Sequence, residues 1–168
     1  MRHHLIRVVQ AGIFLTLFFP AVFQVSAQNR DTEEERDYQY ARELYSGEMY
    51  DMAAKELERF IDTYPSSPNA VSAQYFLAGS YFYQKQFPKT IEIAKSLLKD
   101  HPSAPIVEKI LFLAGKAYFQ LKEYKEGIDA FERMIAGFPA GELASEALYN
   151  IGESRYALKE YPEAAKTY

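Results

Sequence analysis

Residues 75–105 read YFLAGSYFYQKQFPKTIEIAKSLLKDHPSAP, and this stretch contains most of one unit of a repeat. Its proline near the end, Pro102, has counterparts 37 residues away on either side, at Pro65 and Pro139. Three columns of aromatic residues keep the same 37-residue spacing over four units: Tyr38, Tyr75, Phe112 and Tyr149; Tyr45, Phe82, Phe119 and Tyr156; Tyr50, Phe87, Tyr124 and Tyr161. A fixed period of this length predicts a repeat architecture.

Each unit is predicted to contain two helices. Apolar residues within residues 75–105 fall at helical spacing, first at Tyr75, Ala78 and Phe82 and then at Ile91, Ala94, Leu97 and Leu98. A polar turn over residues 84–86 separates the two runs, and Pro88 suits the first turn of the second helix because its missing N–H needs no partner there. The second helix ends ahead of Pro102, since the residue before a proline is pushed out of the helical region. Each unit is therefore an antiparallel helix pair.

The expected fold is all-α, a right-handed α-solenoid of about 3.5 helix pairs over residues 37–168. Small residues recur where two backbones would approach, and large side chains there would force the helices apart: Ala41, Ala78, Gly115 and Gly152 on the first helices, and Ala53, Thr90, Gly127 and Ala164 on the second. The expected units are residues 37–68, 69–105, 106–142 and 143–168, the last incomplete. No capping helix follows Tyr168, so we expect a piece of a longer protein.

This pattern resembles the tetratricopeptide repeat. The residues that carry the resemblance are a small residue, two aromatics, a small residue and a closing proline: Ala78, Tyr81, Phe87, Thr90 and Pro102, then Gly115, Tyr118, Tyr124, Gly127 and Pro139. The usual period is about 34 residues, and the longer loop here looks like the variant of bacterial envelope proteins. Two such families are the periplasmic Tol-Pal-associated division coordinator and the lipoprotein of the outer-membrane β-barrel assembly machinery. The second has a cysteine directly after its signal, where this chain has Gln28, so lipid anchoring by that route is excluded.

The N-terminal residues have the layout of a secretory signal peptide. Arg2 and Arg7 supply a cationic start, an apolar stretch runs from Val8 to Val25, and small residues precede the expected cleavage after Ala27. Residues 1–27 are therefore predicted to be a signal peptide, followed by a charged linker over residues 28–36. The chain is expected to be exported, periplasmic or extracellular, with no transmembrane anchor after cleavage.

Composition argues against an enzyme. The chain has no cysteine, its formal net charge is -4, and acidic and basic residues are interspersed, so neither a thiolate site nor a nucleic-acid footprint is expected. Asp100, His101 and Ser103 have the residue types of a hydrolase triad, but triads are recognised by geometry and not by adjacency. We predict no catalytic residue, no metal site and no cofactor.

The aromatic columns are the candidate partner site. The resemblance implies that the first helices line a concave groove, where aromatic side chains can hold an apolar or extended peptide. The candidate residues are Tyr38, Tyr45, Tyr75, Phe82, Phe112, Phe119, Tyr149 and Tyr156. The alternative is that these rings pack neighbouring repeats together. The positions of a carboxylate clamp read Arg42, Gly79, Lys116 and Glu153, so recognition of a C-terminal carboxylate is not predicted.

The leading hypothesis is an exported protein–protein interaction scaffold or adaptor that serves envelope assembly, transport or division. One alternative is the N-terminal docking module of a larger enzyme or sensor. The other is a repeat protein that binds cell-wall glycans.

Overall fold

The computed structural model describes residues 32–167 and shows eight helices and no strand within them. A helix over residues 32–46 comes first. The helices that follow are α2 (Tyr50–Thr63), α3 (Ala70–Tyr83), α4 (Phe87–Asp100), α5 (Val107–Gln120), α6 (Tyr124–Gly137), α7 (Ala144–Ala157) and α8 (Tyr161–Thr167). Among the described residues, none of these helices is both long and apolar enough to cross a membrane.

The chain divides into two compact units, residues 1–37 and residues 38–168, and the second holds the helical array. The expected signal peptide and the first residues of the expected linker lie outside the described part of the chain. Residues 32–36, assigned to the linker from the sequence, are helical.

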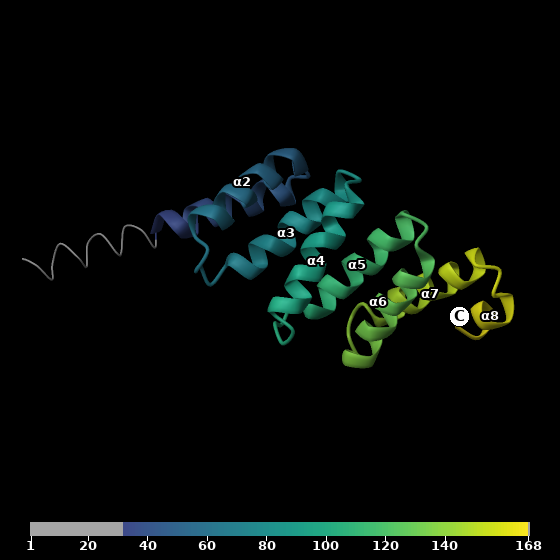
Figure 1. Cartoon of the computed structure of the whole chain (residues 1–168). Coiled ribbons are helices and arrows are strands. Elements are labelled where there is room, and N and C mark those ends of the chain that lie inside the picture. The colour runs from purple at the N-terminus through teal and green to yellow at the C-terminus, as the bar shows by residue number, and fades with distance from the viewer. Residues whose placement is uncertain (1–31, 168) are drawn as a thin grey trace, which may run out of the picture. The chain divides into compact units, whose positions relative to one another are not determined.

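The helix bounds follow the 37-residue period. The second helices begin at the third aromatic column, which consists of Tyr50, Phe87, Tyr124 and Tyr161, and the first helices α3, α5 and α7 begin at Ala70, Val107 and Ala144. Two of the second helices, α4 and α6, each pack against the first helix of their own pair and against the first helix of the next pair (Figure 1). The predicted stack of antiparallel helix pairs is confirmed.

A left-handed residue closes the turn inside each pair. Glu48, Lys85, Lys122 and Lys159 have φ between 60° and 65°, a backbone conformation in which a helix ends and reverses. In the second pair the N–H of Gln86 donates to the carbonyl of Tyr81 at 2.8 Å, and the N–H of Lys85 donates to that of Phe82 at 2.9 Å. These bonds satisfy carbonyls that the end of α3 leaves open.

The small residues lie where the two helices of a pair touch. Ala41, Ala53 and Ala78 are buried, and the hydroxyl of Thr90 donates a hydrogen bond of 3.1 Å to the carbonyl of Ala78 on the facing helix. In the third pair, the ring of Phe131 fills the space beside Gly115. The larger side chains that complete the core are fully buried: Leu57, Phe60, Leu97, Ile110, Phe131 and Met134. Burial of each such side chain stabilises the fold by about 1.5–3 kcal/mol.

Candidate peptide-binding surface

The two predicted aromatic columns differ in exposure along the array. In the first column Tyr38 and Phe112 are buried, with 5% and 8% of their surface exposed, whereas Tyr75 is half-buried and Tyr149 is 56% exposed. In the second column Tyr45, Phe82 and Phe119 are half-buried and Tyr156 is 61% exposed. Tyr38 packs against Phe60, with ring centroids 5.4 Å apart, and is therefore part of the core.

Four of the eight predicted residues line one cavity of about 240 Å³ on the first-helix side of the array. They are Tyr45, Tyr75, Phe82 and Phe112. The other lining residues are Tyr83, Lys109, Leu113, Lys116 and Leu143. The remaining predicted residues, which are Tyr38, Phe119, Tyr149 and Tyr156, do not line this cavity.

The rings around the cavity hold one another in place. Tyr45 makes edge contacts with Phe76 at 5.1 Å and with Tyr83 at 6.2 Å between ring centroids. Tyr83 in turn stacks on Tyr50 at 4.4 Å. Gly79 makes room for Tyr45, because a Cβ atom at residue 79 would lie 2.6 Å from the Tyr45 hydroxyl oxygen. The aromatic wall of the cavity consists of Tyr45, Tyr75, Phe82, Tyr83 and Phe112, which come from the first helix, α3 and α5.

Burial affects the titration of two tyrosines of this wall, Tyr45 and Tyr75. It is the main cause that raises the pKa of Tyr45 and of Tyr75 above the ordinary value of 10.0, and the neighbouring Tyr83 raises both further. Their hydroxyl groups therefore remain hydrogen-bond donors throughout the physiological pH range. An occupant of the cavity would meet apolar ring faces together with a few polar hydroxyl groups.

Two lysines add positive charge, and the sequence reasoning did not place them in the site. The ammonium of Lys116 lies 5.3 Å from the ring centroid of Phe112 and 5.9 Å from that of Phe82, within the range of cation–π attraction. It also lies 3.4 Å from a carboxylate oxygen of Glu146. Lys109, about two turns earlier on α5, is exposed. The sequence did point to Lys116, because it occupies one of the carboxylate-clamp positions that the repeat resemblance places on the first helices.

The residue types of a hydrolase triad do not form a catalytic arrangement. His101 is exposed and its backbone N–H donates to the carbonyl of Leu97 at 2.8 Å, as expected at the end of α4. Asp100 accepts a hydrogen bond of 3.0 Å from Ser96 and not from His101. Over residues 32–167, no three His, Cys, Asp or Glu side chains gather in a way that could hold a metal ion.

The fold defines the class of the protein as a helix-pair repeat protein. A family model described as anaphase-promoting complex, cyclosome, subunit 3 matches residues 46–134, just over half of the chain. A second model, described as tetratricopeptide repeat, matches residues 112–168. The chain belongs to the tetratricopeptide repeat proteins, which confirms the resemblance seen in the sequence.

Several solved structures share the fold at low sequence identity. The MamA protein of Desulfovibrio magneticus RS-1, from residue 41 to its end, is 17% identical with a TM-score of 0.69, over 80% of this chain and 71% of that one. A tetratricopeptide repeat protein from Parabacteroides merdae ATCC 43184 is 18% identical with a TM-score of 0.68, over 80% of this chain and 50% of that one. The apo form of RapI is 14% identical with a TM-score of 0.71, over 80% of this chain and 40% of that one. No match was found among curated proteins.

Proposed function

We propose that this protein is an exported scaffold or adaptor that binds a peptide segment of an envelope protein in the aromatic cavity of its first helices. The tetratricopeptide fold supports protein–protein interaction as the general role. The observation that carries the proposal is the meeting of Tyr45, Tyr75, Phe82 and Phe112 around one cavity. Apolar cavities with a few well-placed polar groups are the usual form of a binding site.

The chemistry of the cavity favours a peptide with an aromatic or aliphatic side chain as its anchor. Such a side chain would fill the space between the rings of Tyr75 and Phe82, and large anchors in pockets supply most of the binding energy at interfaces. Lys109 and Lys116 at the same cavity favour an acidic residue beside the anchor, because their positive charge complements it.

Binding is tested by affinity capture from an envelope extract with the tagged full chain. Lys116→Glu reverses the charge at the cavity without removing a buried side chain, and Tyr75→Ala removes part of the aromatic wall. Tyr149→Ala is the matched control, because Tyr149 occupies the same column as Tyr75 but lies outside the cavity. We expect the first two variants to lose a partner that the control and the wild type retain, with all four proteins helical by circular dichroism. Equal capture by all four would contradict the proposed site.

The exported location rests on the pattern of residues 1–27, in which two arginines precede an apolar stretch and the small residues Ser26 and Ala27. Export predicts that the mature protein in its native cells begins at Gln28. Mass spectrometry of the N-terminal peptide, purified from the envelope fraction, tests this. An intact chain from Met1 in the cytosolic fraction would refute export and leave the binding proposal untouched.

A further inference from the structure

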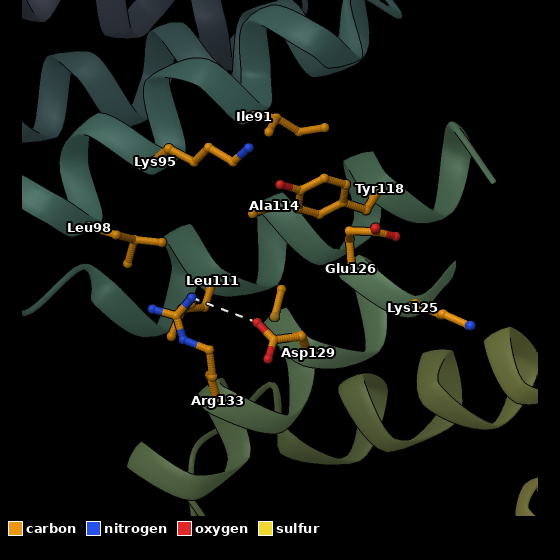
Figure 2. Close-up of a pocket in the computed structure, with 11 residues that line it drawn as sticks. Ile91, Lys95, Leu98, Leu111, Ala114, Tyr118, Lys125, Glu126, Asp129 and Arg133 are labelled. Carbon is orange, nitrogen blue, oxygen red and sulfur yellow. Dashed lines mark ion pairs between the residues drawn. The ribbon is translucent and has the colours of Figure 1, made fainter. Parts of the chain in front are cut away.

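A second cavity lies on the other side of α5, at the junction between the second and third helix pairs. It has a volume of about 400 Å³, it is open to solvent, and residues of α4, α5 and α6 line it (Figure 2). Its floor is apolar, with Ile91, Leu98 and Leu111, and charged side chains surround its opening. None of its lining residues belongs to the aromatic cavity.

The repeat itself shows what is missing at this junction. Leu77 and Ile151 occupy the same position in the second and fourth pairs and are buried, but the third pair has Ala114 there. The contact between the first and second pairs is the first junction, and the contact between the second and third pairs is the second. Ile93, which packs against the core of the first junction, corresponds to Ala130 at the second junction. Two alanines therefore stand where Leu77 and Ile93 pack between the first and second pairs, and both alanines line the cavity.

A carboxylate is missing at the same place. At the first junction the Tyr81 hydroxyl donates to the carboxylate of Glu58, and at the third junction Arg155 pairs with Glu132 at 2.8 Å. At the second junction the corresponding residues are Tyr118 and Lys95, both of which line the cavity.

Lys95 brings a positive charge to the position of the missing acid. Within the described part of the chain, Lys95 makes no hydrogen bond or ion pair, and its ammonium lies 5.8 Å from the ring centroid of Tyr118. Figure 2 shows this ammonium and the Tyr118 hydroxyl pointing toward one another at one edge of the cavity. Two donors therefore face each other where the other junctions join a donor to a carboxylate.

We propose that this cavity binds a small organic carboxylate with a branched aliphatic or aromatic tail. The carboxylate accepts hydrogen bonds from Lys95 and Tyr118, as the Glu58 carboxylate does from Tyr81. The tail lies over Ala114 and Ala130, in the volume of the missing leucine and isoleucine side chains. Arg133, whose guanidinium lies 3.8 Å from Asp129 at the opposite edge, keeps the opening of the cavity polar.

The test is a titration of the full chain with phenylpropionate, followed by backbone amide shifts in NMR spectra. We expect saturable shifts at Ala114 and Tyr118 with a Kd on the order of 1 mM, in keeping with a ligand of this size. The neutral amide, phenylpropionamide, serves as the matched probe and should bind at least tenfold more weakly. Equal binding of acid and amide would overturn the proposal, because the cavity would then select only for apolar character.

Two variants test the two halves of the site. Lys95→Glu supplies the missing carboxylate from the chain itself, and Ala114→Leu supplies the missing side chain. Each should weaken phenylpropionate binding at least tenfold, while circular dichroism and urea unfolding show a fold at least as stable as the wild type. Lys95 is exposed, so its variant remains a valid test even if Ala114→Leu does not fold. Wild-type affinity in the Lys95→Glu variant would overturn the proposal.

The source of the carboxylate is tested with acetyl-Asp-Phe-amide, which carries the same groups on a peptide backbone. Binding of phenylpropionate with equal or higher affinity supports a small free carboxylate. Binding of the peptide alone would overturn the proposal in favour of a protein segment.

Discussion

The hydroxyl group of Tyr81 on α3 donates a hydrogen bond to the carboxylate of Glu58 on α2, and this bond joins the first helix pair to the second. Tyr81 is buried at that junction, whereas Glu58 is exposed. The corresponding residue one repeat later, Tyr118, makes no such bond within the described residues. The two tyrosines therefore form a natural comparison of the same side chain with and without its partner.

Replacement of Tyr81 by phenylalanine should lower the free energy of unfolding by about 1 kcal/mol, the usual net value of one hydrogen bond. Urea unfolding at neutral pH measures this. Tyr118→Phe removes a hydroxyl in the same repeat position without breaking a bond, so we expect it to change stability by less than about 0.5 kcal/mol. Equal effects of the two substitutions would show that the Glu58 bond contributes nothing to stability.

The same bond predicts how stability depends on pH. Burial, the hydrogen bond to Glu58 and the charge of Glu58 raise the pKa of Tyr81 from 10.0 to about 12. Because the folded protein holds this proton more tightly, the stabilisation is complete below pH 10 and is lost as the pH rises from 10 toward 12. Urea unfolding between pH 9 and 12 should therefore show a shallower loss in Tyr81→Phe than in the wild type. The pKa values of Tyr45 and Tyr75 are raised in both proteins, so the difference between the two stability curves isolates the contribution of Tyr81. If the stability of the two proteins fell in parallel with pH, the raised pKa of Tyr81 would be contradicted.

The fold was predictable because the sequence repeats its constraints. Pro65, Pro102 and Pro139 recur at one spacing, and the chemistry of proline alone ends a helix beside each of them. The small residues at 78 and 115 likewise predict a close helix contact whatever the sequence around them.

The candidate site was only partly predictable, since a repeat pattern does not say which copies of a residue are covered. Tyr75 and Tyr149 share a column, yet Tyr75 lines the cavity and Tyr149 lies outside it. The second cavity depends on Lys95 and Ala114, at which the sequence departs from the repeat. A search for recurring residues does not identify such positions. Their meeting at one junction became visible only when α4, α5 and α6 were placed together.

The left-handed turn residues predict a simple stabilising substitution. Lys122 has φ of 62°, which costs a residue with a Cβ atom roughly 1–2 kcal/mol relative to glycine. The larger conformational freedom of glycine in the unfolded chain offsets part of this, so Lys122→Gly should gain about 0.5–1 kcal/mol. Urea unfolding measures the gain. Lys55→Gly, an exposed position inside α2, is the control and should lose about 1 kcal/mol. A loss of stability in Lys122→Gly would mean that the turn is not left-handed in solution.

The close contact between α5 and α6 predicts that one glycine cannot become alanine. A Cβ atom at Gly115 would lie 2.6 Å from a ring carbon of Phe131, and that ring is fully buried among its neighbours. Because a packed ring can move only by displacing the core around it, Gly115→Ala should cost roughly 1–3 kcal/mol in urea unfolding. Gly137 at the end of α6 provides the matched control, since a Cβ atom there meets nothing within 4 Å. Gly137→Ala should leave stability unchanged or raise it by up to about 1 kcal/mol through higher helix propensity. If both substitutions raised stability, the helices of the third pair would have to lie farther apart than Gly115 and Phe131 place them.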